Sequence, residues 1–266
     1  MTKTCKVLKH FSLIKRKSVT MNLRTYISIL TLSLSILIFN SCQKDLGIEG
    51  SGKIIHDFRN ITGFNGVSSE GDYDVYIVET VMKKTEIEVV ADQNFLPYIS
   101  TSLSNGTLVI KTINNHYFKG DRLVRYVTVP YVEYFNLSGS GLMTCDSVYQ
   151  DNMEANLSGS GTISMFGMDV LNLNAKIIGS GEIEMRGKAD VGLFEITGSG
   201  TIKGYSLRGR LELSDCTVKI PGSGTAYVYV WDHLNIYISG SGDVYYRNSP
   251  NIFRDIPGDG SVINDN

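Results

Sequence analysis

Several residue types are scarce in this chain of 266 residues, and each shortage excludes a class of protein. Four cysteines are too few for a disulfide-stapled scaffold. A formal net charge of −2 argues against a protein that neutralises phosphates, so no nucleic-acid partner is expected. Four scattered histidines show no metal-ligand spacing, and no metal or other cofactor is expected. What the chain has in abundance is glycine, with 27 residues, and tyrosine, with 15.

The N-terminal segment has the character of a lipoprotein leader. A charge-free apolar run from Tyr26 to Phe39 is too short for a membrane-spanning helix and typical of a signal-peptide core. The Asn-Ser-Cys sequence that follows resembles a bacterial lipobox, although Phe39 replaces the usual leucine. We therefore predict a leader and signal peptide over residues 1–41, and a membrane partner reached through acyl chains, palmitate among them, on Cys42. A true start at Met21, and an uncleaved N-terminal anchor, stay open.

The charge changes sharply when the leader is removed. Residues 1–41 hold seven of the 25 basic residues and none of the 27 acidic ones, so the rest of the chain has a net charge of −9. An acidic surface disfavours binding to anionic headgroups, and attachment must then come from the acyl chains. Lys44-Asp45 looks like part of an export signal that carries some lipoproteins of the Bacteroides group to the cell surface. We expect an outer-membrane lipoprotein of the bacterial envelope; its periplasmic or surface-exposed face stays open.

A Gly-Ser-Gly triplet recurs along the second half of the chain. Its first glycines are Gly139, Gly159, Gly179, Gly198, Gly222 and Gly240, and Gly258 begins a Gly-Asp-Gly variant. The intervals are 20, 20, 19, 24, 18 and 18 residues. A period of about 20 residues predicts a solenoid in which each repeat forms one coil.

Apolar residues alternate with polar ones on both sides of the triplet. Two residues before it stand Leu137, Leu157, Ile177, Ile196, Ile220, Ile238 and Ile256; four residues after it stand Met143, Ile163, Ile183, Ile202, Ala226, Val244 and Val262. This period of two predicts two short strands per coil, joined by a Gly-x-Gly bend. Coils stacked at ~4.8 Å would bury these columns, and the glycines are expected because the bend needs a positive φ.

Three remaining features of the repeats bear on chemistry. Cys145 and Cys216 fall at inward positions about three coils, or ~14 Å, apart, too far for a disulfide. The triplet serines form a ladder without a nucleophile elbow or partner histidine, which favours a structural role. Asp146-Ser147-Val148 resembles a three-residue O-glycosylation sequon, and whether Ser147 is glycosylated stays open.

The segment before the regular repeats departs from the period. Strands are predicted over 72–78, 86–90, 103–112 and 124–132, with a hairpin turn at Asn105-Gly106 and a short helix within 92–98. The fold class is thus all-β: a parallel β-helix or solenoid with coils of about 20 residues and an N-terminal β cap that contains a hairpin. We expect a tether over 42–52 and one solenoid domain over 53–266, with the cap half at 53–136 and the regular repeats at 137–266.

The order of lipobox, "VVADQNFLPYI", "NGTLVIKT" and repeated Gly-Ser-Gly resembles the family called putative auto-transporter adhesin, head GIN domain, over roughly residues 54–260. The resemblance implies a β-solenoid lipoprotein of the bacterial envelope. It implies neither catalytic residues nor an established ligand.

An aromatic patch is the one candidate binding surface. Inward Ala226, Val228 and Val230 alternate with residues that must face outward, and the patch consists of Tyr227, Tyr229, Trp231, Tyr237 and Tyr245. Exposed aromatic side chains stack on sugar rings or anchor protein partners. The alternative is that these rings pack against one another as cross-strand ladders.

The leading hypothesis is therefore a non-enzymatic envelope lipoprotein that acts in adhesion or in binding of a glycan or surface-protein ligand. The alternative is a structural, self-assembling envelope protein. A polysaccharide-active enzyme is a third hypothesis, disfavoured because the outward charged residues do not cluster by column. The oligomeric state stays open.

Overall fold

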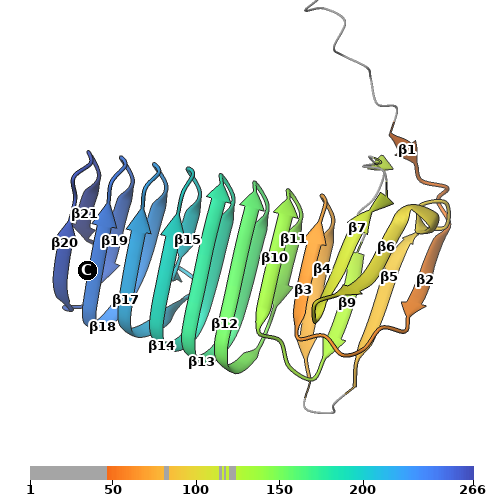
Figure 1. Ribbon diagram of the computed structural model, residues 1–266, viewed down its shortest axis with the longest axis horizontal. Coiled ribbons are helices and arrows are strands. Elements are labelled where there is room, and N and C mark those ends of the chain that lie inside the picture. Colours follow the sequence, from red (N-terminus) through yellow and green to blue (C-terminus); the bar gives the residue numbers. More distant parts are fainter. Residues whose placement is uncertain (1–46, 81–83, 114–115, 117, 120–123) are drawn as a thin grey trace, which may run out of the picture. The chain divides into compact units, whose positions relative to one another are not determined.

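The computed structural model describes residues 47–80, 84–113, 116, 118–119 and 124–266, and nearly all of its regular structure is β-strand (Figure 1). The expected leader and Cys42 lie outside these residues. The strands are β1 (Ile48–Glu49), β2 (Ile54–Arg59), β3 (Gly66–Glu70), β4 (Asp74–Glu79), β5 (Glu86–Asp92), β6 (Ile99–Ser104), β7 (Thr107–Thr112), β8 (Phe118–Lys119), β9 (Val124–Val129), β10 (Tyr134–Gly139), β11 (Leu142–Cys145), β12 (Val148–Gly159), β13 (Thr162–Gly179), β14 (Glu182–Ile196), β15 (Thr201–Lys203), β16 (Tyr205–Ser206), β17 (Gly209–Ile220), β18 (Thr225–Ile238), β19 (Asp243–Arg247), β20 (Asn251–Asp255) and β21 (Ser261–Asn264).

The strands form two parallel ladders that face each other across one core. Sheet 1 contains the segments that follow each bend, in the order β9, β4, β11, β13, β14, β15, β18, β19 and β21. Sheet 2 contains the segments that precede each bend, in the order β7, β3, β10, β12, β13, β14, β17, β18 and β20. The predicted parallel β-solenoid is confirmed.

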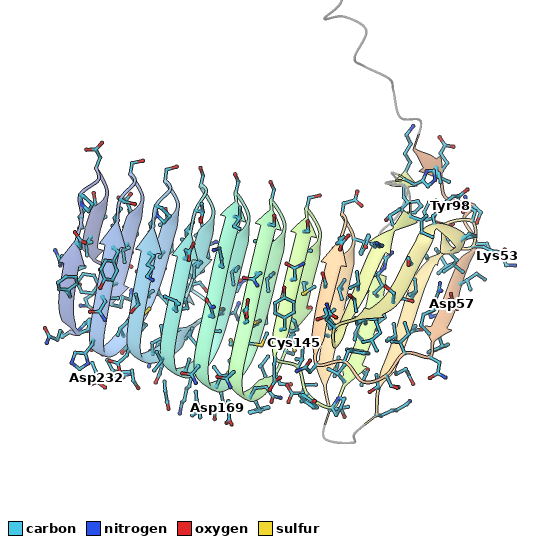
Figure 2. The ribbon with its side chains drawn as sticks, in the orientation of Figure 1. Lys53, Asp57, Tyr98, Cys145, Asp169 and Asp232 are labelled. Carbon is cyan, nitrogen blue, oxygen red and sulfur yellow. The ribbon has the colours of Figure 1, made fainter. Side chains whose placement is uncertain are left out.

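The strands are longer than the sequence indicated. β13 runs for 18 residues, because inter-coil hydrogen bonding continues round the turn opposite the triplet and the strand serves both sheets. The prediction of two separate short strands per coil is therefore wrong for these coils. Asp169 and Asp232 mark the opposite turns, where their side chains point into solvent (Figure 2).

The predicted columns are the actual inter-coil partners. Leu137 lies opposite Leu157, which lies opposite Ile177, and Met143 lies opposite Ile163 in the same way. All five side chains are buried in the core. Burial of such side chains contributes ~1.5–3 kcal/mol each, so the stacked columns are a main source of stability.

Cys145 and Cys216 occupy the inward positions predicted for them, and both are buried and free. Cys145 lies opposite Met165 in sheet 1, and Cys216 lies opposite Leu234 in sheet 2. Burial raises the pKa of the Cys145 thiol to about 11. At neutral pH it is therefore an uncharged, packed side chain rather than a nucleophile.

Glycine is required in the triplets mainly because neighbouring coils approach closely. A Cβ atom on Gly159 would collide with the carbonyl oxygen of Gly139, and one on Gly179 would collide with that of Gly159. The φ angles of these three glycines, 139–141°, are also unfavourable for other residues. Positive φ was the predicted reason for the glycines, but it is absent from the later triplets that begin at Gly198 and Gly222, whereas the close approach persists there.

The serine of each triplet is bonded chiefly through its backbone. The Ser160 N–H donates to the Gly139 carbonyl at 3.0 Å, and the Ser180 N–H donates to the Gly159 carbonyl at 2.9 Å. The hydroxyls are exposed, and that of Ser199 lies 3.2 Å from that of Ser223 one coil later. The triplet serines therefore have a structural role, since their backbone hydrogen bonds join the bends of neighbouring coils.

The N-terminal region mixes strand directions. β2 pairs antiparallel with β5, β5 pairs antiparallel with β9, and β6 and β7 form the predicted hairpin, with φ of 48° at Asn105 and 75° at Gly106. The predicted short helix within 92–98 is present only as a 3-10 helix, η1 (Leu96–Tyr98), and not over the first residues of the range, since Asp92 still ends β5. Pro97 stands in the first turn of η1, where its missing N–H costs no hydrogen bond.

A buried arginine lies in the core of this region. Arg125 of β9 is wholly buried, and its guanidinium carbon lies 3.6 Å from the ring centre of Tyr73. None of its three side-chain nitrogens has a hydrogen-bond partner among the residues that the structure describes. Burial lowers the pKa of Arg125 to about 10, although Tyr73 and Asp72 oppose the shift. The side chain therefore stays charged at neutral pH and stacks on the ring of Tyr73.

Candidate functional site

The longest repeat interval, 24 residues, builds an overhang on sheet 1. After β15 the chain forms β16, which turns back antiparallel on the start of β17, with Tyr205 opposite Arg210. Gly204 anchors this turn, since its N–H donates to the Tyr227 carbonyl at 2.8 Å and its own carbonyl accepts from Leu211 at 2.6 Å. Leu207 stands at the tip, fully exposed. The extra residues therefore project from the sheet instead of lengthening a strand.

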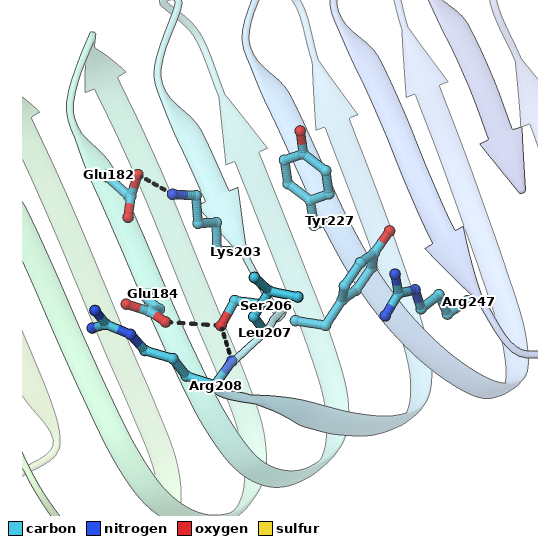
Figure 3. Close-up of a pocket in the computed structure, with 9 residues that line it drawn as sticks. Glu182, Glu184, Lys203, Ser206, Leu207, Arg208, Tyr227 and Arg247 are labelled. Atoms are coloured by element: carbon cyan, nitrogen blue, oxygen red, sulfur yellow. Dashed lines mark hydrogen bonds and ion pairs between the residues drawn. The ribbon is translucent and has the colours of Figure 1, made fainter. Parts of the chain in front are cut away.

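A pocket of about 550 Å³ lies beside the overhang and opens to solvent (Figure 3). Its lining comes from β14, β15, the overhang, β18 and β19, and consists of Glu182, Glu184, Lys203, Tyr205, Ser206, Leu207, Arg208, Tyr227 and Arg247. This volume is within the range of small-molecule binding pockets. We refer to it as the overhang pocket.

Ion pairs hold two acidic side chains of the overhang pocket in place. Glu182 pairs with Lys203 at 2.6 Å, one coil further along. Glu184 accepts from Arg186 at 2.8 Å and from the Ser206 hydroxyl at 3.2 Å. Burial raises the pKa of Glu184, but the hydrogen bond and charge of Arg186, helped by Ser206, outweigh burial and leave that pKa below its usual value. The Glu184 carboxylate is therefore ionised at neutral pH.

The opposite wall is tied to the C-terminal segment. Arg247 pairs with Asp265 at 2.8 Å and lies over the Tyr205 ring, 4.3 Å from its centre. The Tyr205 hydroxyl also donates to Asp265, at 2.9 Å. Burial and the Asp265 carboxylate raise the pKa of Tyr205, which stays a neutral donor. The wall is therefore a connected network of hydrogen bonds, an ion pair and a cation–π contact.

The structure brings four of the five predicted aromatic residues together on sheet 1. Tyr227 stacks on Tyr245 with ring centres 4.9 Å apart and planes 14° apart, and it meets Tyr205 edge-on. Tyr229 meets Trp231 edge-on at 5.6 Å. Tyr227 and Tyr245 thus form a cross-strand ladder of the kind that the alternative interpretation expects, whereas Tyr229 and Trp231 contact each other within β18, and Trp231 keeps half of its surface exposed.

Tyr237 does not belong with the other four. It lies in the second half of β18, opposite Asp255 of β20, and is therefore part of sheet 2. There its ring packs beside Phe253. The prediction that all five form one patch is wrong, because β18 passes round the turn between Trp231 and His233 and presents its two halves on different sheets.

Most of the overhang pocket was missed by sequence reasoning. Of the lining residues the aromatic pattern predicts only Tyr227, and Lys203 and Glu184 belong to outward charged residues that do not cluster by column in the sequence. The available signal was the interval of 24 residues between Gly198 and Gly222, since four residues beyond the usual period must leave the coil. The direction of that departure depends on β16 pairing with β17, which no periodic pattern reveals.

No group of three or more His, Cys, Asp or Glu side chains suited to a metal ion occurs among the described residues. Within that same part of the chain, no helix has the length and apolar character to cross a membrane.

A family model described as "Putative auto-transporter adhesin, head GIN domain" matches residues 63–250, most of the chain. The chain belongs to this family. Three solved structures share the fold of this head GIN domain protein: a "putative adhesin" from Bacteroides fragilis (19% identity, TM-score 0.73, covering 82% of this chain and 96% of that one), a "Putative lipid binding protein" from Parabacteroides distasonis (24%, 0.67, 81% and 98%), and a "putative adhesin" from Parabacteroides merdae (19%, 0.64, 81% and 98%). A comparison with curated proteins yielded no match.

Proposed function

We propose that this head GIN domain protein is a non-enzymatic lipoprotein of the bacterial cell envelope that binds a glycan or protein ligand at the overhang pocket. The observation that carries the proposal is the pocket itself. It is built on sheet 1 by the coil between Gly198 and Gly222, which is longer than the usual repeat of about 20 residues. The adhesin description of the family, and of two of the solved neighbours, supports adhesion at the envelope.

The lining of the pocket bears on the kind of ligand. One solved neighbour is titled a lipid-binding protein. In this chain five of the nine lining residues are charged, although most of the surface that lines the pocket is apolar. An acyl chain that covered the charged groups would remove their water without replacing it. Polar side chains held by ion pairs next to an aromatic ring favour a ligand with both hydroxyl and apolar faces.

Removal of the apolar contacts at the pocket should weaken ligand binding. We expect the double variant Leu207→Ser/Tyr227→Ala to lose at least tenfold in affinity for ligands found by screening the full chain against glycan arrays and cell surfaces. The reason is that Leu207 is fully exposed at the mouth and Tyr227 presents its ring to the pocket. Surface-immobilised binding assays measure the effect.

The matched control is Leu171→Ser, which removes an exposed leucine of β13 outside the overhang pocket. It should bind as the unmodified chain does. Thermal unfolding of each variant separates lost binding from lost folding. Retained binding in a folded double variant would refute the pocket as the ligand site.

The lipid anchor is proposed from the leader. Cys42→Ala is expected to abolish labelling of the protein by a palmitate analogue and to move it out of the detergent-extracted membrane fraction, because a thiol is needed for acylation and the rest of the chain is acidic. The control Cys145→Ala removes a buried cysteine and should keep the label. A labelled Cys42→Ala protein would contradict the proposed anchor.

A further inference from the structure

The charges around the overhang pocket discriminate between ligand classes, and this inference rests on the function proposed above. Glu182, Glu184 and Arg247 each have an oppositely charged partner. Arg208 does not: only its backbone N–H is engaged, by the Ser206 hydroxyl at 3.2 Å, and its guanidinium has no partner among the described residues. Arg208 is exposed on the overhang, so the open charge at the mouth is positive.

The two carboxylates of the pocket add a second constraint. Glu182 contacts Lys203 through one oxygen, and Glu184 contacts Arg186 and Ser206 through one oxygen. In each case the structure shows no partner for the second oxygen among the described residues. An ionised carboxylate can only accept hydrogen bonds. These oxygens suit hydroxyl donors and repel a ligand with several closely spaced acidic groups.

A third constraint comes from the apolar surfaces. Leu207 is fully exposed at the mouth, and the Tyr227 ring is held in place by Tyr245, which stacks on it. A ligand that covers both needs a flat face of C–H groups. A sugar ring has such a face and carries its hydroxyls around the rim.

We propose that the overhang pocket binds an acidic sugar, with a ring carboxylate paired to Arg208. The planar guanidinium fork matches a carboxylate in two parallel hydrogen bonds. The sugar hydroxyls donate to Glu182 and Glu184, and the C–H face packs on Leu207 and Tyr227. Lys203 stays with Glu182, so one negative charge on the ligand balances the site.

A peptide is a poorer fit to the same surface. Strand addition needs a free sheet edge, but β15 is paired with β14 on one side and with β18 on the other. An acidic peptide long enough to fill the pocket would also bring further carboxylates towards Glu182 and Glu184. The sugar satisfies all three constraints with one charge.

The test is a titration of the full chain with the methyl glycoside of galacturonic acid, the methyl ester of that sugar and a short glutamate-rich peptide. The acidic sugar, with its single carboxylate, should bind, and more weakly as salt is raised. Arg208→Ala should weaken this binding by roughly tenfold or more, as expected for the loss of a charge-assisted pair. The control Arg254→Ala, an exposed arginine of β20 in sheet 2, should leave it unchanged.

The outcomes separate this inference from the proposed function. Equal binding of the methyl ester, no binding of the acidic sugar, or an unchanged Arg208→Ala variant overturns the acidic-sugar inference. Tighter binding of the peptide, with the same dependence on Arg208, overturns it in favour of a protein ligand. The proposal that the pocket is the ligand site is tested separately, by the Leu207→Ser/Tyr227→Ala variant. That variant should lose binding of any ligand of the pocket, whatever the charge of the ligand.

Discussion

Gly159→Ala is expected to lower the free energy of unfolding by about 3 kcal/mol or more. The new Cβ would collide with the Gly139 carbonyl oxygen, which accepts hydrogen bonds from the Ser160 N–H at 3.0 Å and the Gly161 N–H at 2.9 Å. Any shift that relieves the collision weakens both inter-coil bonds. The φ of 141° at residue 159 adds strain for a side chain. Chemical denaturation measures the loss.

Ser160→Ala is the matched control in the same triplet. The Ser160 hydroxyl is exposed and its backbone N–H is retained, so the change should stay within about 0.5 kcal/mol. Near-equal stability of the two variants would show that the coils have room to separate locally, and that the glycines are not required for close approach.

Arg125→Met is expected to raise the free energy of unfolding by about 1–4 kcal/mol, a gain instead of the usual loss on core substitution. The guanidinium is wholly buried and its three nitrogens have no hydrogen-bond partner among the described residues, so folding strips its water without replacement. Methionine replaces the alkyl stem of arginine and is flexible enough to fill part of the space beside the Tyr73 ring, and the expected gain is net of the volume that the guanidinium leaves. Thermal and chemical unfolding at neutral pH give the comparison.

Arg125→Lys provides the contrast for this prediction. It keeps a buried charge but gives up the flat stack on Tyr73, so it should be less stable than the unmodified chain. A destabilised Arg125→Met variant would mean that the stacking of arginine on Tyr73 outweighs its desolvation.

The regular half of the fold was predictable because one repeat implies one register. Leu157 and Ile163 could be assigned to the core from alternation alone, and the structure pairs them with Leu137 and Met143 as the triplet spacing requires. A one-residue slip would turn every side chain to the opposite face, so the pattern tolerates a single alignment.

The N-terminal half shows where this reasoning stops. The coil formed by β3 and β4 lies between β7 and β9 on one side and β10 and β11 on the other, although β5 to β9 separate it from β10 in sequence. Local patterns found the strands and the Asn105-Gly106 turn, but the order of strands depends on which surfaces remain unpaired once the chain has collapsed. The burial of Arg125 follows from that order.

The aromatic patch divides in the same way. Outward-facing positions followed from alternation, and Tyr227 and Tyr245 stack because they are one coil apart. Assignment to a sheet did not follow, since β18 carries Tyr229 and Tyr237 in one unbroken strand and only the position of its turn separates them.

By itself the sequence determined the coil, its period, the inward columns and the bend, because each depends on contacts that repeat at a constant separation along the chain. Only the tertiary structure decided how the irregular coil after Gly198 folds back, and hence that Glu182, Leu207, Tyr227 and Arg247 line one pocket. Those residues come from different coils, and their proximity depends on the antiparallel contact of β16 with β17. A repeat specifies how the coils stack, whereas the contacts made by an irregular insertion depend on the folded surface against which it packs.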